Sequence, residues 1–461
     1  MHKIIFEITD LIEFLLYNRE ATGIQRYQLC IIREISNKFP EATQVCYTLP
    51  SQNNRYVMRG ADLFADSENS ANKILSRIGV IKNGFPNKAT VQRLLHGFGR
   101  RKIARALKKI DIYLSAIAFR KRYHIIAGIE HGLPLPVPRE AIKIPAPNDI
   151  LIITGVSIGL HLQHTFALAH KQAGGRVIQV IHDLIPCVHP EYFTAEHSAK
   201  LISWFNQLST YATNFVCVSE NTRSDLIKNL LIPSENTHTI SLQHDFPGHP
   251  RITNDSQYLS AEPDHGSLHK SFVLCVGTLE VRKNGTHLLR AWRKVVDQLG
   301  SATPQLIFAG KRGWHIEEFE QFLANCPELE QKVTLTGSIS DTDLAMLYKS
   351  CLFTVFPSLY EGWGLPIGES LWFGKLCITS NISSMPEVGG PLCDYVDPCD
   401  VDQLAAAALR AICDSDYRRT KEQAIRAAPL RSWADVALDF CSHLEHLSKT
   451  GHPTMTDRCA P

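Results

Sequence analysis

Short apolar segments followed by helix-forming sequence recur along the chain, and they limit its fold more than any other feature. Residues 150–154, 177–181 and 215–218 are segments of this kind. Alternation of strand and helix predicts right-handed βαβ units, whose strands form a parallel sheet. Such sheets bind ligands at the carboxyl ends of their strands. We therefore expect an α/β protein whose functional residues follow strand ends.

The length of the chain fits two domains. Its 461 residues are too many for one ordinary hydrophobic core. Periodicity is lost at residues 245–269, which are rich in Pro, Gly, His, Asn and Ser, and a second strand–helix series begins after them. We predict an N-terminal Rossmann-like domain at 1–250 with a basic insertion near 55–125, a linker at 251–270, a C-terminal Rossmann-like domain at 271–430, a helix at 431–450 and a loose tail at 451–461.

The cysteines and the N-terminus bear on the compartment. Thirteen cysteines are scattered without a CxxC pair or a compact Cys/His cluster, which indicates reduced, buried thiols rather than disulfides or a zinc site. Lys3 is followed by a short apolar run that ends at Glu7, so a signal peptide is not indicated, and the chain has no apolar run long enough to span a membrane. We predict a cytoplasmic protein, or one bound peripherally to the inner face of the cytoplasmic membrane.

A glycine turn flanked by two glutamates lies within residues 356–390. Glu361 precedes the turn, and Glu369 follows Pro366. Because proline is favoured at the start of a helix, Pro366 marks the helix start and Glu369 is expected in the first turn. The free N–H groups there favour a phosphate, whereas the carboxylates suit sugar hydroxyls. The pattern indicates a nucleotide sugar; glutamates that merely face solvent or favour the helix dipole are the alternative.

The same stretch resembles the donor-binding signature of the family 4 glycosyltransferases, which have the GT-B fold. The similarity includes EGWGLP, the second glutamate, a short helix ending at Gly374, and SNISSMPEVGG. It implies two Rossmann-like domains that face each other across a cleft, an N-terminal one that binds the acceptor and a C-terminal one that binds the nucleotide sugar, with the helix at 431–450 crossing back onto the N-terminal domain. It also implies that Glu361 holds hydroxyls of the transferred sugar and Glu369 those of the ribose, while amides near Gly364 and Leu365 hold the diphosphate.

Two adjacent cations, Arg282 and Lys283, follow a strand end in GTLEVRKN. They suit a pyrophosphate, because the leaving nucleotide diphosphate gains charge as the glycosidic bond breaks. The segment resembles the GT-x-E-x-RKN version of the family motif, which adds Gly277 and Thr278 to the donor site. Many members have arginine where this chain has Thr278, so the cationic role falls to Arg282 and Lys283. Without the resemblance, a solvated surface pair is the alternative.

Three other loops match the family pattern. TGIQRY, which contains Gly23, resembles a loop that faces the cleft, although an ordinary helix cap explains it as well. HDLIP resembles the HD motif, whose histidine lies near the transferred sugar; His182 follows a strand, where a structural histidine is the alternative. In VTLTGSIS, the segment from Gly337 to Ile339 corresponds to a turn that contacts the nucleobase through its backbone.

The resemblance implies transfer with retention of anomeric configuration and without a metal or other cofactor. Two Asp-x-Asp triplets, at 341–343 and 414–416, precede apolar-periodic segments, where aspartates cap helices. We therefore do not interpret them as metal ligands. Lys283 and Arg282 would neutralise the diphosphate, whose leaving phosphate would accept the proton of the acceptor. The predicted catalytic residues are Glu361, His182, Lys283 and Arg282.

The GT-x-E-x-RKN branch includes mannosyl- and rhamnosyltransferases of surface-polysaccharide assembly. GDP-mannose is therefore the first expectation for the donor, and a glycan or lipid-linked glycan for the acceptor. Two other classes stay open: another GT-B enzyme, such as a sugar-nucleotide epimerase or a phosphorylase, and a non-catalytic nucleotide-sugar-binding protein. A binding protein would tolerate loss of a glutamate or a cation, yet both glutamates and both cations are present.

Residues 73–124 carry fourteen Lys and Arg against one acidic residue. Within them RRKIARALKKI places apolar residues on one helical face beneath a cationic one, as in helices that lie on anionic membranes. A solvated helix face is the alternative. Nucleic acid is not expected as a partner, because neither aromatic interleaving nor a nucleic-acid fold signature accompanies the charge.

Overall fold

The computed structural model describes residues 3–17, 21, 23–48, 55–64, 71–78, 140–141, 144–156, 161–253 and 271–449. Most of the basic segment, most of the predicted linker and the C-terminal tail lie outside these residues. The chain divides into two units, Met1–Ser157 with His161–Gly175, and Ile158–Leu160 with Arg176–Pro461. The domain boundaries predicted from the sequence stay predictions.

The first unit contains a sheet segment with the strand order β4-β3-β2-β1-β5. Strand β1 pairs in parallel with β2 and β5, whereas β3 pairs antiparallel with β2 and β4. The antiparallel pairing of β3 differs from the parallel sheet that was predicted. Parallel strands need a long crossover connection, and too few residues join β2 to β3 for one. The strands are β1 Ile4–Glu7, β2 Thr43–Thr48, β3 Arg55–Arg59, β4 Glu140–Ala141 and β5 Ile150–Ile153, and the helices are α1 Thr9–Tyr17, α2 Gly23–Lys38, α3 Gly60–Leu63, α4 Ala71–Arg77 and α7 His161–Gln172.

In the second unit, the strands β6 Arg176–Ile181, β7 Asn214–Cys217 and β8 Thr237–Thr239 pair in parallel. A separate six-stranded sheet has the order β11-β10-β9-β12-β13-β14. All of its strand pairs are parallel, so the α/β class and the parallel pairing predicted from the sequence are confirmed here. Its strands are β9 Phe272–Val276, β10 Gln305–Ala309, β11 Val333–Gly337, β12 Thr354–Phe356, β13 Cys377–Ser380 and β14 Asp394–Val396.

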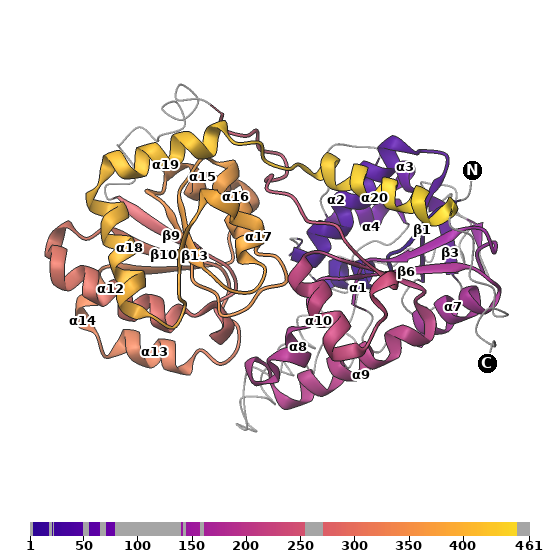
Figure 1. Cartoon of the computed structure of the whole chain (residues 1–461), viewed down its shortest axis with the longest axis horizontal. Helices are drawn as coiled ribbons and strands as arrows, with labels where there is room; N and C mark the ends of the chain where they lie inside the picture. The colour runs from indigo at the N-terminus through magenta and orange to yellow at the C-terminus, as the bar shows by residue number, and fades with distance from the viewer. Residues whose placement is uncertain are drawn as a thin grey trace, which may run out of the picture. The chain divides into compact units, whose positions relative to one another are not determined.

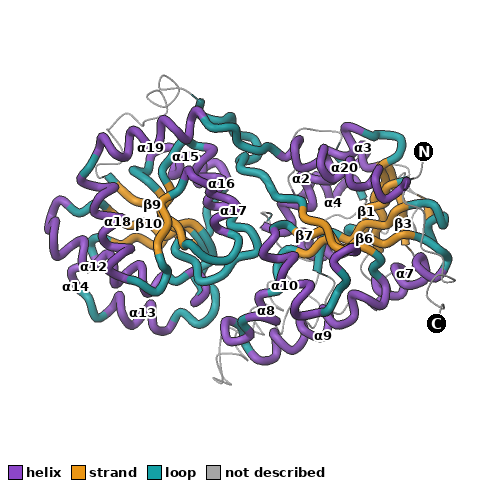
Figure 2. Tube along the Cα trace, viewed as in Figure 1, coloured by secondary structure: helices purple, strands orange, loops and turns teal. Residues whose placement is uncertain are grey.

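Helices cover both faces of the six-stranded sheet (Figure 1), and Figure 2 distinguishes β9 and β10 from the helices and loops around them. The helices of this unit are α8 Ile185–Val188, α9 Ala195–Tyr211, α10 Glu220–Leu230, α12 Gly285–Leu299, α13 Glu317–Ala324, α14 Pro327–Glu330, α15 Asp341–Ser350, α16 Leu365–Trp372, α17 Met385–Gly389, α18 Val401–Cys413, α19 Ser415–Ala427 and α20 Trp433–Lys449, with 3₁₀ turns that include η1 Pro190–Tyr192. In the final helix α20, the ring of His443 stacks on that of His238 in β8, with centroids 4.1 Å apart.

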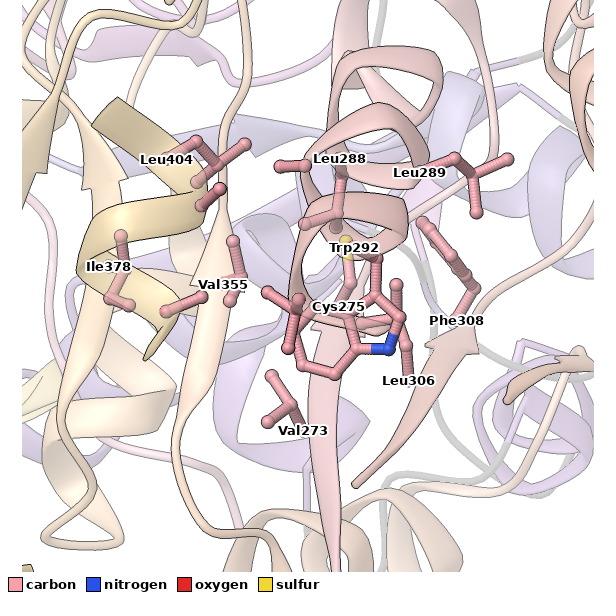
Figure 3. Close-up of a cluster of buried hydrophobic side chains, with 14 of the residues drawn as sticks. Val273, Cys275, Leu288, Leu289, Trp292, Leu306, Phe308, Val355, Ile378 and Leu404 are labelled. Atoms are coloured by element: carbon pink, nitrogen blue, oxygen red, sulfur yellow. The ribbon is translucent and has the colours of Figure 1, made fainter. Parts of the chain in front are cut away.

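Successive residues of β9 point to opposite faces of the sheet, as the pleat requires. Val273 and Cys275 join a core formed with α12 and α18, whereas Phe272 and Leu274 join a second core with α15. Figure 3 shows the first core, in which the Trp292 side chain of α12 lies among strand side chains. The two cores fix the sheet between helix layers, so the carboxyl ends of its strands are the edge that positions the loops of the site.

Helix caps explain the two Asp-x-Asp triplets. Asp341 starts α15, and Asp343 donates its backbone N–H to the cap residue Ser340. The Asp414 carboxylate caps α19 by accepting from the Tyr417 N–H at 2.8 Å. Over the described residues, no group of three or more His, Cys, Asp or Glu is arranged to hold a metal.

The same part of the chain contains no helix long and apolar enough to cross a membrane. Its cysteines are free, and most of them are buried, in agreement with the interpretation of reduced thiols.

The first prediction concerns Trp292, which is fully buried and whose indole N–H has no hydrogen-bond partner among the described residues. Trp292→Ala should lower the free energy of unfolding by about 3–5 kcal/mol, because it leaves a cavity. Trp292→Phe keeps most of the ring volume and removes the unpartnered donor, so it should cost much less. Urea unfolding followed by circular dichroism measures both values, and equal losses would contradict the cavity argument.

Candidate functional site

The glycine turn opens helix α16, as predicted. Gly364 precedes the helix with φ of 113°, a conformation that favours glycine, and Pro366 lies at the helix start. The N–H groups of the first turn, including that of Leu365, have no intrahelical acceptor. One expectation is wrong: Glu369 does not lie in the first turn, which contains no acidic residue. The helix begins at Leu365, so Glu369 lies one turn further in.

Glu361 forms an ion pair with both predicted cations. Its carboxylate oxygens lie 2.5 Å from Lys283 Nζ and 2.7 Å from Arg282 Nη1. Burial alone would raise the pKa of Glu361, but Arg282 and Lys283 lower it to about 2. We refer to Arg282, Lys283 and Glu361 as the ion-pair cluster. The carboxylate is therefore ionised and fixed, which suits it to accept hydrogen bonds rather than to exchange protons.

Arg282 connects the loop after β9 to the loop after β12. Its guanidinium also pairs with Glu280 at 2.7 Å and donates to the Tyr360 carbonyl at 2.6 Å. Burial would lower its pKa, but Glu361 and Glu280 raise it. The nearby Asp183 carboxyl has a raised pKa, chiefly because it is buried, although Arg282 opposes the shift. Arg282 therefore holds the cluster together as well as supplying charge.

Lys283 extends beneath the end of β9. Its Nζ lies 4.7 Å from the centre of the Phe356 ring, and a side chain at Gly277, where φ is 144°, would contact its aliphatic chain. The glycine thus leaves room for the lysine. Among the described residues, Glu361 is the carboxylate that pairs with Lys283, so the ammonium keeps donor capacity that the more extensively bonded Arg282 lacks.

The other strand-end positions gather beside the same sheet. A Cβ at Gly310 would overlap the Gly277 carbonyl and lie 3.2 Å from the backbone N of Thr278. Gly310 also forms a backbone bridge to Gly337, whose φ is 70°. Ile339 packs partly buried against the core on the α15 side. The structure therefore places Gly277, Thr278, Gly337 and Ile339 at or just beyond the carboxyl ends of β9 and β11.

His182 lies against the glycine turn through its backbone. A Cβ at Gly362 would overlap the His182 carbonyl oxygen, and the Ser219 hydroxyl donates to the Gly362 carbonyl at 2.7 Å. The end of β6 therefore contacts the loop that carries Glu361. The remaining predicted residue, Gly23, is the first residue of α2 in the first unit.

Glu369 is buried and accepts a hydrogen bond from the Tyr348 hydroxyl at 2.7 Å. Burial, together with the Glu369 charge, raises the pKa of Tyr348 well above its ordinary value. Tyr348 could not be predicted from the sequence, because its neighbours in α15 give no sign of a carboxylate partner in another helix.

Two serines and a third glutamate of the segment SNISSMPEVGG also contribute, although the sequence motif gives them no role. Ser383 accepts from the Glu361 N–H at 3.0 Å, and Ser384 donates to the Glu361 carbonyl at 2.9 Å. Glu387 accepts from the backbone N–H groups of Glu220 and Asn221 at 2.7 and 2.8 Å, at the start of α10. The serines fix the Glu361 backbone, and Glu387 attaches the next loop to α10.

Comparison with known proteins assigns the part of the chain that carries most of this site. Residues 262–428 match the family described as glycosyl transferases group 1. They belong to that family. The match contains the ion-pair cluster, Glu369 and the strand-end loops, whereas His182 and Gly23 precede it.

Proteins with similar sequences include O-antigen enzymes of Escherichia coli. The chain is 29% identical over 253 residues to O-antigen chain mannosyltransferase B, covering 55% of this chain and 65% of the relative. It is 26% identical over 294 residues to serotype-specific mannosyltransferase WbdA, covering 63% of this chain and 36% of the relative. The matches thus span less than two thirds of the length of either relative.

A solved structure shares the fold. The Anabaena protein HepE, crystallised in complex with UDP-glucose, has a TM-score of 0.59 at 14% identity, covering 97% of this chain and 100% of that chain. This likeness confirms the GT-B fold class predicted from the sequence.

The second prediction follows from the pKa of Glu361, which is about 2 in the folded chain against an ordinary value of 4.5. A depressed folded pKa stabilises the fold above the unfolded pKa, and this contribution is lost as pH falls through the folded pKa. Glu361→Gln should therefore cost about 3 kcal/mol at pH 7, and the cost should shrink below pH 4.5. Urea unfolding at pH 7 and pH 3 measures it, because most of the contribution is still present at pH 4 and is lost only as the pH approaches the folded value.

The matched control is Glu235→Gln, because Glu235 is exposed and has no ion pair among those described. It should change stability little at either pH. A Glu361→Gln cost that is the same at both pH values would rule out the ion pair as its source.

Proposed function

We propose that the chain is a retaining glycosyltransferase that moves a hexose from a nucleotide sugar to an acceptor hydroxyl. The observation that carries the proposal is the buried Glu361 carboxylate between Lys283 and Arg282. It lies at the carboxyl ends of parallel strands, where α/β proteins bind ligands. Cations beside a helix N-terminus suit a diphosphate, and an ionised carboxylate suits sugar hydroxyls.

The names of the relatives support a mannose donor and an acceptor in surface polysaccharide. Two are E. coli mannosyltransferases, one named for the O-antigen chain. GDP-mannose is therefore the first donor to test, and a glycan or lipid-linked glycan, as in lipopolysaccharide assembly, is the acceptor class. The UDP-glucose complex of HepE supports the broader class of nucleotide-sugar donors.

In this proposal Lys283 and the backbone N–H groups of Gly364 and Leu365 bind the diphosphate. The diphosphate would compete with Glu361 for the Lys283 ammonium, and sugar hydroxyls would replace the lysine as donors to Glu361. Glu369, positioned by Tyr348, would hold the ribose hydroxyls. These interactions orient the donor and stabilise the charge that develops on the leaving group.

The leaving phosphate would take the proton of the acceptor hydroxyl on the face that the acceptor attacks. His182 would shape that face, because its backbone lies against the glycine turn. We further propose that the enzyme acts in the cytoplasm and that the basic residues at 73–124 contact an anionic membrane surface, as their charge supports.

The third prediction tests the donor and the cluster together. In a panel of nucleotide sugars, GDP-mannose should raise the melting temperature most, since a ligand at 100 times its Kd stabilises by about 2.7 kcal/mol. Lys283→Ala and Glu361→Ala should each lower kcat/KM by about 10²–10³-fold, the usual effect of removing a group that stabilises developing charge. Sugar transfer measured by mass spectrometry gives these rates.

Lys294→Ala is the control, because Lys294 also pairs with a carboxylate, that of Asp402, but is half exposed on α12. It should keep full activity. If no nucleotide sugar stabilised the protein, or if both cluster variants kept full turnover, the proposal would fail.

The fourth prediction concerns metals. We propose that Lys283, Arg282 and the N-terminus of α16 supply the charge that a divalent ion supplies in other transferases. Turnover should then stay within twofold after dialysis against EDTA, and added Mg²⁺ or Mn²⁺ should not raise it. Loss of activity on dialysis, with recovery on adding metal, would sink this part of the proposal.

A further inference from the structure

Six aromatic side chains adjoin one another in the second unit, outside the ion-pair cluster. The Tyr360 and His189 rings lie 4.8 Å apart, and the His189 and Tyr192 rings are stacked at 5.0 Å. Further along, Phe193 lies 6.0 Å from Trp314 and 5.8 Å from His197. We call this set the aromatic track: Tyr360, His189, Tyr192, Phe193, His197 and Trp314.

One hydrogen bond joins the two halves of the aromatic track. The indole N–H of Trp314, in the loop after β10, donates to the Tyr192 carbonyl at 2.8 Å. Tyr192 ends the 3₁₀ turn η1, and Phe193 follows it. The aromatic track is thus assembled from three segments that are distant in sequence, residues 189–197, the loop after β10 and the loop after β12, and the contact to the Tyr192 carbonyl joins the first two.

The rings of the aromatic track are not core residues. None of the six is buried, and Trp314 is 41% exposed. Tryptophan has a large apolar surface and is highly buried on average, so an exposed one beside other rings indicates a binding surface. The carboxylate of the exposed Glu191 lies 2.9 Å from His189 Nδ1. It places a negative charge beside the rings.

The aromatic track begins at the ion-pair cluster. Tyr360 directly precedes Glu361, and its carbonyl accepts a hydrogen bond from Arg282 at 2.6 Å. Its hydroxyl is held by Asp225 at 2.7 Å, which fixes the ring. A ligand that lies along the aromatic track therefore has one end next to the carboxylate assigned to the transferred sugar.

We propose that the aromatic track binds the acceptor glycan, an assignment that rests on the function proposed above. The C–H groups on the face of a pyranose ring carry partial positive charge and pack on the negative face of an aromatic ring. The hydroxyls at the edge of the sugar find acceptors and donors in Glu191, His189 and the Tyr192 hydroxyl. A lipid chain would gain nothing from this charged rim, so an acceptor with several sugar residues fits better.

A binding experiment tests this without requiring turnover. Mannotriose, maltotriose and chitotriose are titrated into the full chain while tryptophan fluorescence is followed. At least one trisaccharide should change the fluorescence of the wild type, and Trp314→Phe should lose most of that change, since it lacks the reporting indole. No response to any of the three, or an equal response in the variant, overturns the proposal.

Kinetics separate a binding role from a merely structural one. Trp314→Leu and Phe193→Leu should raise KM for the trisaccharide acceptor on the order of tenfold, with kcat and the donor KM within twofold of the wild type. Trp314→Phe keeps a ring but loses the hydrogen bond to Tyr192, so it should retain most of the acceptor affinity. If Trp314 served only to fix η1, the Phe and Leu variants would be equally impaired.

Leu438→Ala is the control, since Leu438 in α20 is 47% exposed and lies outside the aromatic track; it should leave both KM values unchanged. Melting temperatures of all variants identify any that fail to fold. If a nucleotide sugar stabilises the wild type but Trp314→Leu leaves the acceptor KM unchanged, only the assignment of the aromatic track is contradicted. A wild type that no nucleotide sugar stabilises contradicts the proposed function instead.

Discussion

The buried contact between Glu361 and the two cations is the interaction on which the other loops of the site depend. Three charged groups taken out of water are tolerated only when they are paired and hydrogen-bonded. Here Arg282 reaches Glu280 and the Tyr360 carbonyl, while Ser383 and Ser384 fix the backbone on either side of the Glu361 carboxylate. Buried ion pairs contribute little net stability against apolar replacements. The main effect of this ion pair is to hold the loops that follow β9, β12 and β13 in one fixed arrangement.

A second set of contacts extends that geometry to the end of β6. The Ser219 hydroxyl caps α10 and donates to the Gly362 carbonyl, and the Glu387 carboxylate accepts from the first two N–H groups of the same helix. A carboxylate at a helix N-terminus is favoured by the helix dipole. Because glycine has no Cβ, the turn at Gly362 can also approach the His182 carbonyl. His182, separated by almost two hundred residues from the glycine turn, is thereby held beside it.

Features encoded by neighbouring residues could be predicted from the sequence. Short-range patterns or a motif encode the parallel pairing of the six-stranded sheet, the opening of a helix by the glycine turn, and the placing of Arg282 and Lys283 in one site. The hydrogen bonds from Ser384 to Glu361 and from Tyr348 to Glu369 could not be predicted. Both partners come from other elements, and serine and tyrosine form hydrogen bonds in many structural settings. Antiparallel β3 was missed because its direction is set by a short connection rather than by its composition. The prediction that Glu369 lies in the first turn of the helix was wrong because the helix begins at Leu365, before the proline.

Under the proposed function, charge balance decides which groups can bind the diphosphate. Arg282 and Lys283 face Glu361 and Glu280, so the charges of the two cations and the two carboxylates cancel. The cluster therefore attracts a diphosphate only if Glu361 exchanges the two cations for other hydrogen-bond donors, or if uncharged dipoles also bind the diphosphate. The N-terminus of α16 supplies such dipoles, and sugar hydroxyls supply such donors. Thr278, which follows Gly277, is uncharged, so under the proposed function the helix N-terminus and the exchange of partners at Glu361 contribute more of the binding. Under the proposed function, recognition of the phosphate and of the sugar would be coupled through one carboxylate, and a nucleotide diphosphate without its sugar would bind more weakly than the intact donor.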